Sequence, residues 1–377
     1  MTWVSFPRAR AGAERSGRMR LDGGVNDDHA LIRWGVLSTG HIASTFARDL
    51  ALLPDEAVLA AVGSRTLDKA EAFAREHGFA RAYGSYAELA GDPEVDVVYI
   101  GSTHNDHFPS AKLCLEAGKG VLVEKPLTVT PDEAEELVSL ARERDLFLME
   151  AVWTRTNPLI RKTTEIVRSG ELGPVRHVAA SFGFAFQGDE THRLLDPDQA
   201  GGAILDLGVY PVHGVNLFLG EPDQVLGYGS HASTGVDSHA AATLTFPATE
   251  SRPAATASVL CTLEATVPTR LEVFCTKGRV LIDSFIRPAE ISVFRGTSGD
   301  EPEVLVTQWP GGGYTFQAAE VMRCLRAGEN ETPLVPWADT LACMRTLDRW
   351  RAAVDAGAAG ARVNGSAVAA GAAGAAG

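Results

Sequence analysis

The chain has 377 residues, of which 45% are apolar and 22% charged, and its formal net charge is -14 at pH 7. This length favours two domains over one, and the acidic balance argues against a nucleic-acid partner, which would bind a basic surface. No apolar run approaches the roughly 18 residues of a membrane span, and the five cysteines form no CxxC pair, so we expect no membrane partner and a cytoplasmic location.

Both ends of the chain have the composition of tails. Residues 1–30 are rich in arginine and lack the apolar stretch of a secretory signal. We expect a disordered tail there, with Met1 or Met19 as the true start and a transit peptide as the alternative. Residues 355–377 form an Ala/Gly tract without periodicity, which also predicts a disordered tail.

Residues 31–150 alternate short apolar runs with helical patterns. The expected strands are residues 32–37, 58–63, 95–100, 121–124 and 146–149. The expected helices are residues 41–53, 68–77, 109–117 and a run capped by Thr130, in which Pro131 takes the first helical position and Glu133 completes a capping box. Strict alternation of this kind predicts a doubly wound parallel sheet with helices on both faces.

The second half, residues 151–351, follows a different pattern. One helical run, 158–169, precedes strand-like runs at residues 175–186, 224–231, 240–246, 255–263, 271–275, 278–282 and 290–295. Because few helices separate these runs, we predict an α+β domain with a mainly antiparallel sheet. A last helical pattern, 338–354, is expected to pack back on the first domain.

The first expected strand runs into STGHIA, residues 38–43. A dinucleotide-binding turn needs small residues at three points, and Gly40 and Ala43 fill the second and third, while Ser38 stands where glycine is usual. A strand before the motif and a helix after it favour a dinucleotide site over an ordinary strand–helix turn. The helix start at His41 and Ile42 would then offer unpaired N–H groups to the pyrophosphate.

The end of the second strand determines which dinucleotide is preferred. A chain that selects NAD usually carries an acidic residue there, but this chain reads Ser64-Arg65. A serine and an arginine suit a 2′-phosphate, so we predict NADP, with NAD still possible. Asp68 is expected to cap the next helix. The alternative is that Arg65 is a solvated surface charge.

The third strand ends in GSTHNDH, residues 101–107. Two histidines among small polar residues could indicate a metal, but no carboxylate-rich cluster with ligand spacing accompanies them, so we predict no metal. We expect Ser102, His104 and His107 to lie in a loop that lines the cofactor, at the carboxyl end of the sheet.

The strand at 121–124 ends in Glu124-Lys125-Pro126. A strand this apolar is expected to be central, and its carboxyl end then opens into the ligand cleft. Both charged residues are therefore candidates for the site. The alternative is a surface Glu–Lys pair at the end of a strand.

These pieces together resemble the Gfo/Idh/MocA oxidoreductase family. The resemblance covers about residues 31 to 350 and is carried by WGVLSTGHIA (34–43), SR (64–65), VEKP (123–126), EAVWTRTNP (150–158) and GGAILDLGVYPVHG (201–214). The last three are most similar to the branch of dimeric dihydrodiol dehydrogenases and NADP-dependent D-xylose dehydrogenases, whose members can also lack the first glycine of the fingerprint. The resemblance implies a Rossmann domain followed by an open-faced antiparallel sheet, which commonly mediates dimerisation.

The resemblance also implies roles for several residues. Lys125 would stand beside the nicotinamide and assist proton transfer, Glu124 would help to hold the cofactor, and Pro126 would fix the turn, with a cis bond as one means. Trp153 and Arg155 would lie near the cofactor or the substrate entrance. The alternative for this last pair is a packing tryptophan and a surface arginine.

Within GGAILDLGVYPVHG, the resemblance makes Tyr210 the proton donor and acceptor. Pro211 is comfortable only in a first helical turn, so we expect a helix to start near Asp206. Asp206 would position the substrate hydroxyl or Lys125, and His213 would either support the site or be structural. A nearby lysine ammonium is expected to lower the pKa of the tyrosine.

The function that follows is NADP-dependent transfer of hydride between the nicotinamide and a secondary alcohol of a cyclic polyol. The candidate substrates are an aldose such as D-xylose and a trans-dihydrodiol. An inositol or other sugar dehydrogenase of the same family, and a non-catalytic NADP-binding sensor, are the alternatives. We expect a homodimer or higher homo-oligomer formed through the C-terminal sheet.

Overall fold

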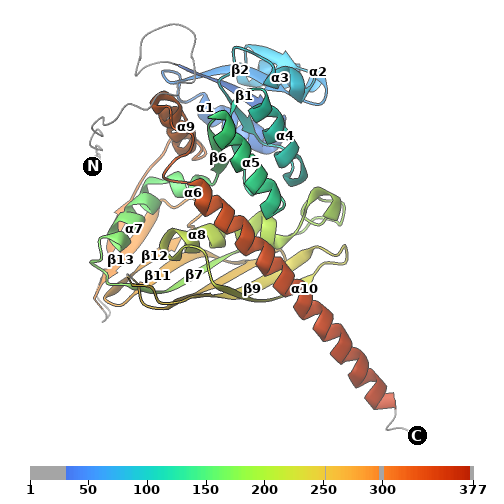
Figure 1. Ribbon diagram of the computed structural model, residues 1–377, viewed down its shortest axis with the longest axis vertical. Helices are drawn as coiled ribbons and strands as arrows, with labels where there is room; N and C mark the ends of the chain where they lie inside the picture. The colour runs from blue at the N-terminus through green and yellow to red at the C-terminus, as the bar shows by residue number, and fades with distance from the viewer. Residues whose placement is uncertain (1–30, 251, 297–300, 374–377) are drawn as a thin grey trace.

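The computed structural model describes residues 31–250, 252–296 and 301–373. The expectations for residues 1–30, including the choice between Met1 and Met19, therefore lie outside the described residues. Figure 1 shows two stacked parts, with a parallel sheet and its helices above and a larger sheet below. The parallel sheet expected for the first half and the mainly antiparallel sheet expected for the second half are both confirmed.

The upper sheet is parallel throughout its described strands. In spatial order these are β3 (Arg81–Tyr83), β2 (Ala57–Gly63), β1 (Ile32–Leu37), β4 (Val97–Ile100), β5 (Gly120–Glu124) and β6 (Leu148–Ala151). The strand order reverses between β1 and β4. Such a reversal opens a crevice at the carboxyl ends of the strands, where doubly wound sheets bind ligands. β3, with three residues, was too short to be recognised from its pattern.

The helices that cover this sheet are α1 (His41–Leu50), α2 (Leu67–His77), α3 (Tyr86–Ala90), α4 (His104–Glu116) and α5 (Pro131–Arg144). The capping box at α5 is confirmed, because the Thr130 hydroxyl accepts from Glu133 N at 3.3 Å and the Glu133 carboxylate accepts from Thr130 N at 3.1 Å. The prediction for α4 was wrong at its start. Pro109 suggested a helix start, yet this proline lies inside a helix that begins five residues earlier.

The lower sheet is mixed. In spatial order its described strands are β14 (Glu303–Val306), β13 (Glu290–Arg295), β12 (Gly278–Asp283), β11 (Val267–Cys275), β7 (Val175–Gly183), β10 (Ala255–Thr262), β9 (Asp237–Phe246) and β8 (Gln224–His231). β7 and β10 run parallel, and the other neighbours are antiparallel. The helices of this half are α6 (Trp153–Thr156), α7 (Pro158–Arg168) and α8 (Val209–Leu219), and α8 packs on β7 and β10.

Two helices near the end of the chain differ from expectation. α9 (Thr315–Ala327), which we did not predict, packs on the first domain beside α1 (Figure 1), where Arg326 pairs with Glu56 at 2.9 Å. α10 (Trp337–Ala373) was expected to pack back on the first domain. It lies instead mainly along β8 and α8, and reaches the first domain at α5.

The prediction of a disordered tail over 355–377 was wrong as far as Ala373, because α10 continues through it and extends beyond the sheet (Figure 1). Alanine has the highest helix propensity of all residues, while each glycine costs about 1 kcal/mol in a helix, so a mixed tract can follow the helix that precedes it. Residues 374–377 lie outside the described part of the chain.

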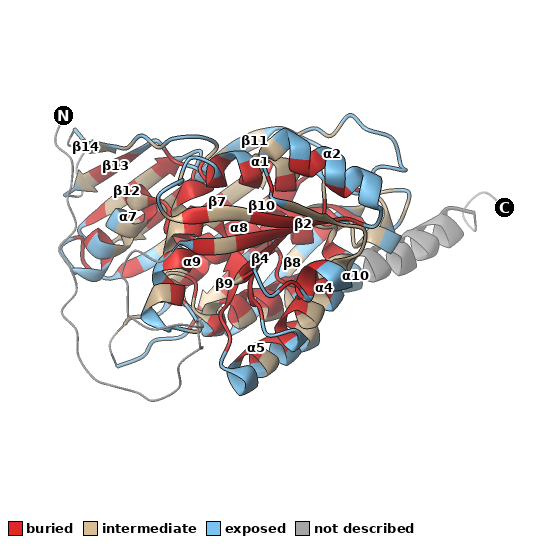
Figure 2. Cartoon of the chain, turned by 90° about the horizontal axis from the view of Figure 1, so that it is seen from above, coloured by how far each residue is buried: buried red, intermediate tan, exposed pale blue. Residues whose placement is uncertain are grey.

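The strands of the upper sheet are buried on both faces, whereas those of the lower sheet alternate buried and more exposed residues, so that one face of that sheet stays open. Figure 2 shows helices with one buried and one exposed face around the buried strands. Among the described residues, the stretch Pro197–Leu219 is long and apolar enough to cross a membrane. However, 89% of its apolar window is buried inside the protein, as in the core helix of a globular domain.

Candidate active site between the two domains

The turn after β1 has the shape of a dinucleotide-binding turn. Ser38 takes a φ of 88°, a left-handed conformation that glycine adopts easily, and its hydroxyl donates to Gly101 O at 2.7 Å. Gly40 is the N-cap of α1 and provides no side-chain cap, and a Cβ placed on it would meet nothing closer than 4.0 Å. The N–H groups at the start of α1 are thus left uncapped by side chains beside open space, which fits a pyrophosphate.

The end of β2 presents Ser64 and Arg65. The Ser64 side chain is buried, with its hydroxyl 3.4 Å from that of Thr39, whereas Arg65 is exposed. The N-cap of the following helix α2 is Thr66 and not Asp68, which lies in the first helical turn, and Thr66 makes no side-chain capping bond. The end of β2 is thus followed by a buried hydroxyl, an exposed arginine and a helix start without a side-chain cap.

Of the three residues that we expected in a loop after β4, Ser102 lies in that loop, whereas His104 and His107 lie in the first turn of α4. His107 Nδ1 lies 2.8 Å from Pro126 O, and burial together with the neighbouring His104 lowers the pKa of His107 to about 3. The neutral ring donates to this carbonyl and so supports the Lys125–Pro126 turn, whose peptide bond is cis. The Ser102 hydroxyl is buried without a hydrogen-bond partner in the described part of the chain.

Lys125 and Asp206 meet across the interface of the two domains. Lys125 follows β5, and Asp206 lies in a π-helical turn, Ile204–Gly208, that leads into α8. Lys125 Nζ donates to Asp206 O at 2.7 Å and lies 3.4 Å from Asp206 Oδ1. Gly208 allows this turn to pack against α10, since a Cβ there would lie 3.0 Å from the ring of Trp350.

Tyr210 completes this group, with its ring centroid 5.1 Å from Lys125 Nζ. The expectation that the lysine lowers the pKa of Tyr210 was wrong. Burial, followed by the Glu124 and Asp206 carboxylates, raises the pKa of Tyr210 well above its ordinary value. The Lys125 ammonium is hydrogen-bonded to Asp206 and lies over the Tyr210 ring. Because the pKa of the phenol is raised, the phenol keeps its proton and is neutral at neutral pH.

Two carboxylates beside this group differ in pKa. Burial raises the pKa of Glu124 to about 7, against the opposing effect of a 2.7 Å hydrogen bond from Tyr99 Oη. For Asp206, burial opposes ionisation, but the Lys125 ammonium and His104 outweigh it and hold the pKa well below its ordinary value. Asp206 is therefore the fixed negative charge of the site.

Arg155 does not belong to the site. Its side chain is 2% exposed and its guanidinium pairs with Asp339 of α10, so it is enclosed and joins α6 to α10. This pairing favours a role in packing for Arg155 over the expected contact with the cofactor. Trp153 lies closer, with its ring 4.7 Å from that of Tyr314 and its indole near enough to Tyr210 to moderate the rise of the phenol pKa.

His213 is part of a buried pair and does not reach the group around Lys125. Its Nε2 lies 3.1 Å from Glu150 Oε2, and both side chains are no more than 1% exposed. The other oxygen of Glu150 accepts from Leu127 N at 3.1 Å. His213 is thus structural, because it ties α8 to the end of β6.

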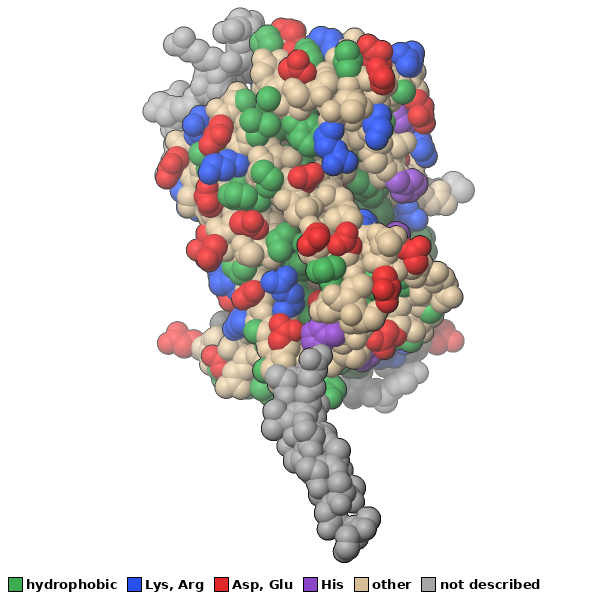
Figure 3. Space-filling view, turned by 90° about the vertical axis from the view of Figure 1, so that its right-hand side faces the viewer, with side chains coloured by type: hydrophobic (Ala, Val, Ile, Leu, Met, Phe, Trp, Pro, Cys, Tyr) green, Lys and Arg blue, Asp and Glu red, His purple; other side chains and the backbone are tan. Residues whose placement is uncertain are grey.

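Three further residues of this region were not predicted from the sequence. Arg193 donates to Asp206 Oδ1 at 3.0 Å, Tyr99 bonds Glu124, and Tyr314 packs on Trp153. Tyr99 lies inside a strand, and the other two follow irregular segments, so neither periodicity nor motif marks them. Figure 3 shows the molecule hollowed between its upper and lower parts, with histidine and basic side chains at the rim.

His104 also lies at this interface, with Nε2 3.4 Å from Asp206 Oδ1 and Nδ1 3.2 Å from Ala200 O. Within the described ranges, no three His, Cys, Asp or Glu side chains gather in a way that could hold a metal ion. The site therefore combines an uncapped helix start, an ammonium, a fixed carboxylate and a neutral phenol. Such a set can bind a dinucleotide and move a proton at a substrate oxygen.

Comparisons with known proteins match both halves of the chain. Residues 32–152 match the model of an oxidoreductase family with an NAD-binding Rossmann fold, GFO_IDH_MocA. Residues 160–281 match the C-terminal domain of the same family. The two matches together cover more than half of the chain and divide it where the two sheets divide.

Curated relatives match over nearly their whole length. A trans-1,2-dihydrobenzene-1,2-diol dehydrogenase from Mus musculus is 37% identical, covering 86% of this chain and 97% of its own. A D-xylose 1-dehydrogenase (NADP(+)) from Hypocrea jecorina is 35% identical, covering 84% and 90%. Among solved structures, a 3-ketoreductase from Actinomadura kijaniata in complex with NADP and TDP-benzene has a TM-score of 0.73 at 28% identity, covering 86% and 98%.

Proposed function

The chain belongs to the Gfo/Idh/MocA oxidoreductase family, and we propose that it is an NADP-dependent dehydrogenase that oxidises a secondary alcohol of a cyclic polyol. The observation that carries this proposal is the meeting of Lys125, Asp206 and Tyr210 at the carboxyl end of the parallel sheet. The named activities of the relatives, on a dihydrodiol and on D-xylose, support these two substrate classes.

The residues of the site have distinct parts in the proposed reaction. Ser38, Gly40, His41 and Ile42 would hold the pyrophosphate at the start of α1, and Ser64 with Arg65 would hold the 2′-phosphate. The remaining predicted contacts with the cofactor are those of Ser102, His104, His107, Glu124, Lys125 and Trp153. When bound, the nicotinamide takes up or returns a hydride.

The chain itself moves the proton. In the direction of reduction, the neutral phenol of Tyr210 donates its proton to the substrate oxygen, and the Lys125 ammonium stabilises the negative charge that develops. In the direction of oxidation, the same groups act in reverse and the phenolate takes the proton of the carbinol. Asp206, which stays ionised, orients the ammonium through its backbone and side-chain oxygens.

The test of this proposal is turnover of a panel of alcohols with NADP, followed by the absorbance of the reduced cofactor. The panel contains D-xylose, other aldoses, inositols and trans-dihydrodiols. Oxidation of D-xylose or a dihydrodiol supports the proposal, and a clear preference for an inositol favours the alternative within the family. Tight NADP binding without turnover across the panel would identify a non-catalytic sensor.

Arg65→Ala is expected to lower kcat/KM with NADP by about tenfold or more, because a charge-assisted bond to the 2′-phosphate is lost. Turnover with NAD, which lacks this phosphate, should change by less than about twofold. Steady-state kinetics with both cofactors provide the measurement. Arg75→Ala, an exposed arginine later in α2, is the control, and an equal loss with NADP and NAD in Arg65→Ala contradicts the assignment.

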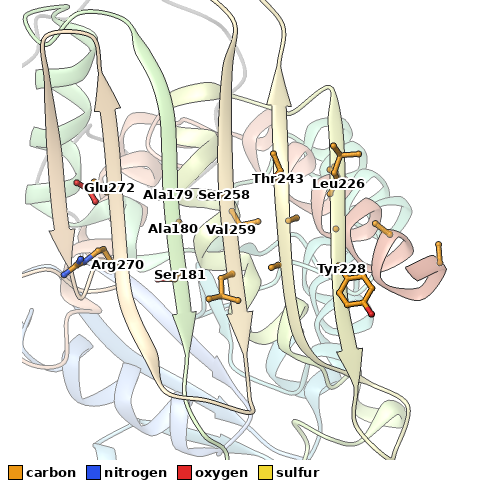
Figure 4. A pocket seen from close by; sticks show the side chains of 17 residues that line it. Ala179, Ala180, Ser181, Leu226, Tyr228, Thr243, Ser258, Val259, Arg270 and Glu272 are labelled. Atoms are coloured by element: carbon orange, nitrogen blue, oxygen red, sulfur yellow. The ribbon is translucent and has the colours of Figure 1, made fainter. Parts of the chain in front are cut away.

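We also propose that the open face of the lower sheet binds a second copy of the chain. This face carries a trough of about 940 Å³. Figure 4 shows small side chains along it, such as Ala179, Ser181, Thr243 and Ser258. At its β8 edge stand Leu226 and Tyr228, which are 61% and 64% exposed. A two-fold axis would place the large side chains of one copy in the trough of the other, which makes the face self-complementary.

Leu226→Asp is expected to convert a homodimer into a monomer, because a desolvated carboxylate would oppose association. Light scattering coupled to size-exclusion chromatography measures the mass. Leu52→Asp changes an equally apolar residue, 47% exposed, in the first domain and should leave the dimer intact. A Leu226→Asp protein that keeps the mass of the wild type would contradict this interface.

We further propose a cytoplasmic location, which the five free cysteines support.

A further inference from the structure

A charged side chain outside every motif lies beside the Lys125–Asp206 pair. Arg193 Nη1 approaches Asp206 Oδ1 to 3.0 Å, and the same oxygen lies 3.4 Å from both Lys125 Nζ and His104 Nε2. Arg193 therefore makes the closest side-chain contact of the three. Its side chain is 45% exposed, whereas that of Asp206 is 9% exposed, so a largely buried carboxylate meets a partly solvated guanidinium.

The backbone around Arg193 is built to hold it there. Leu194 is buried and its carbonyl accepts from Gly202 N at 2.9 Å. Gly201 permits this packing, because a Cβ on it would lie 2.6 Å from Arg193 O and 2.8 Å from Leu194 O. The backbone at Arg193 is thus held by a buried neighbour and a close backbone contact, and from there the guanidinium reaches Asp206.

The same segment, residues 184–203, joins the two domains. Asn105 Nδ2 in the first turn of α4 donates to Asp198 O at 3.1 Å, and His104 Nδ1 lies 3.2 Å from Ala200 O. The segment leaves β7 and returns to the turn that carries Asp206. Arg193 therefore extends from a strand connection that is attached to both domains, beside the group that handles the substrate oxygen.

We propose that Arg193 is a positioning residue for Lys125, an inference that rests on the proposed function. Arg193 neutralises the Asp206 carboxylate, so that the Lys125 ammonium stays bonded to the Asp206 carbonyl oxygen and keeps N–H groups for the substrate oxygen. Without Arg193, Lys125 would be the full cation nearest to a buried carboxylate, and the attraction between opposite charges at low dielectric would draw it into a tighter pair.

The kinetic test compares Arg193→Met, which keeps the bulk and removes the charge, with Arg193→Lys, which keeps the charge. For the alcohol that the wild type oxidises fastest, Arg193→Met should lower kcat about tenfold, since a small displacement of a catalytic group costs at least this much. KM for NADP should stay within about twofold, and Arg193→Lys should recover most of kcat. An unchanged kcat in Arg193→Met, or a loss that Arg193→Lys does not recover, overturns the inference.

The chain offers a closely matched control. Arg323 is also 45% exposed and pairs at 2.9 Å with Glu320, which is 10% exposed, on α9 and away from the site. Arg323→Met removes the same kind of ion pair and should leave kcat as in the wild type. An equal loss of kcat in Arg323→Met and Arg193→Met would show a general effect of losing a half-buried ion pair, and would overturn the positioning role.

A second measurement does not depend on turnover. Lys125 is acetylated with an N-hydroxysuccinimide ester, and its rate is determined by mass spectrometry relative to that of Lys112, an exposed lysine of α4. A tighter pair with Asp206 should slow the labelling of Lys125 about fivefold in Arg193→Met and not in Arg193→Lys. Unchanged labelling overturns the inference. Slower labelling in a protein that oxidises no alcohol of the panel would support the positioning of Lys125 and contradict the proposed dehydrogenase function.

Discussion

Lys125→Met is expected to lower kcat by about 10²-fold or more, the range for a group that takes part in proton transfer. The variant removes the ammonium that lies 2.7 Å from Asp206 O and 5.1 Å from the centroid of the Tyr210 ring. Negative charge on the substrate oxygen would then develop without a cation beside it, in a site that is largely closed to water. Steady-state kinetics with NADP and the best alcohol of the panel provide the measurement.

Lys112→Met is the control for this variant, because the Lys112 side chain is 39% exposed and its partner Glu136 is 51% exposed. The melting temperature should be followed in both proteins, since Lys125 also joins the two domains through Asp206. A folded Lys125→Met protein with near-normal kcat would remove the lysine from the mechanism. Loss of NADP binding with normal kcat at saturation would reduce its role to holding the cofactor.

Tyr210→Phe should lower kcat by about 10²-fold or more as well, and it should leave the affinity for NADP unchanged. The change removes one oxygen, and the ring keeps its packing against Phe182, whose centroid lies 5.8 Å away. The reaction therefore loses its proton donor while the wall of the pocket stays in place. Equilibrium titration with NADP separates this loss from a failure to bind the cofactor.

The pH dependence gives this prediction a second readout. Burial and two neighbouring carboxylates raise the pKa of Tyr210, so the phenol keeps its proton at neutral pH. Oxidation requires the phenolate, and its rate in the wild type should therefore rise with pH through the neutral range. Tyr210→Phe should remove that rise. Tyr228→Phe, which changes an exposed tyrosine of the lower sheet, should keep it. Turnover by Tyr210→Phe with the rate and pH profile of the wild type would exclude this tyrosine.

Much of the fold could be predicted because local and long-range signals agree. The apolar strand β5, the capping box at Thr130 and the alternation of strands with helices all indicate the same parallel sheet, and the structure has it. The errors occur where local signals are weak or mixed. Pro109 lies inside α4, and the Ala/Gly tract continues α10, because packing or a preceding helix outweighs the local preference.

The site was less accessible to sequence reasoning. The family resemblance was enough to propose Lys125, Asp206 and Tyr210 as one group, and the structure brings them together. It could not assign the partner of Arg155, because Asp339 is distant in sequence. The pKa of Tyr210 was predicted in the wrong direction for a similar reason. The direction depends on burial and on Glu124, which only the folded chain brings near the phenol.

The position of α9 has a consequence for synthesis of the protein. Asp49, at the end of α1, accepts from Gly312 N at 2.6 Å and from Tyr314 N at 2.7 Å, and α9 then packs on the nucleotide-binding half. That half is therefore completed by residues translated after the whole lower sheet. When residues 31–151 have been synthesised, the parallel sheet has an apolar flank that no helix covers yet. This flank stays exposed until α9 is synthesised some 160 residues later.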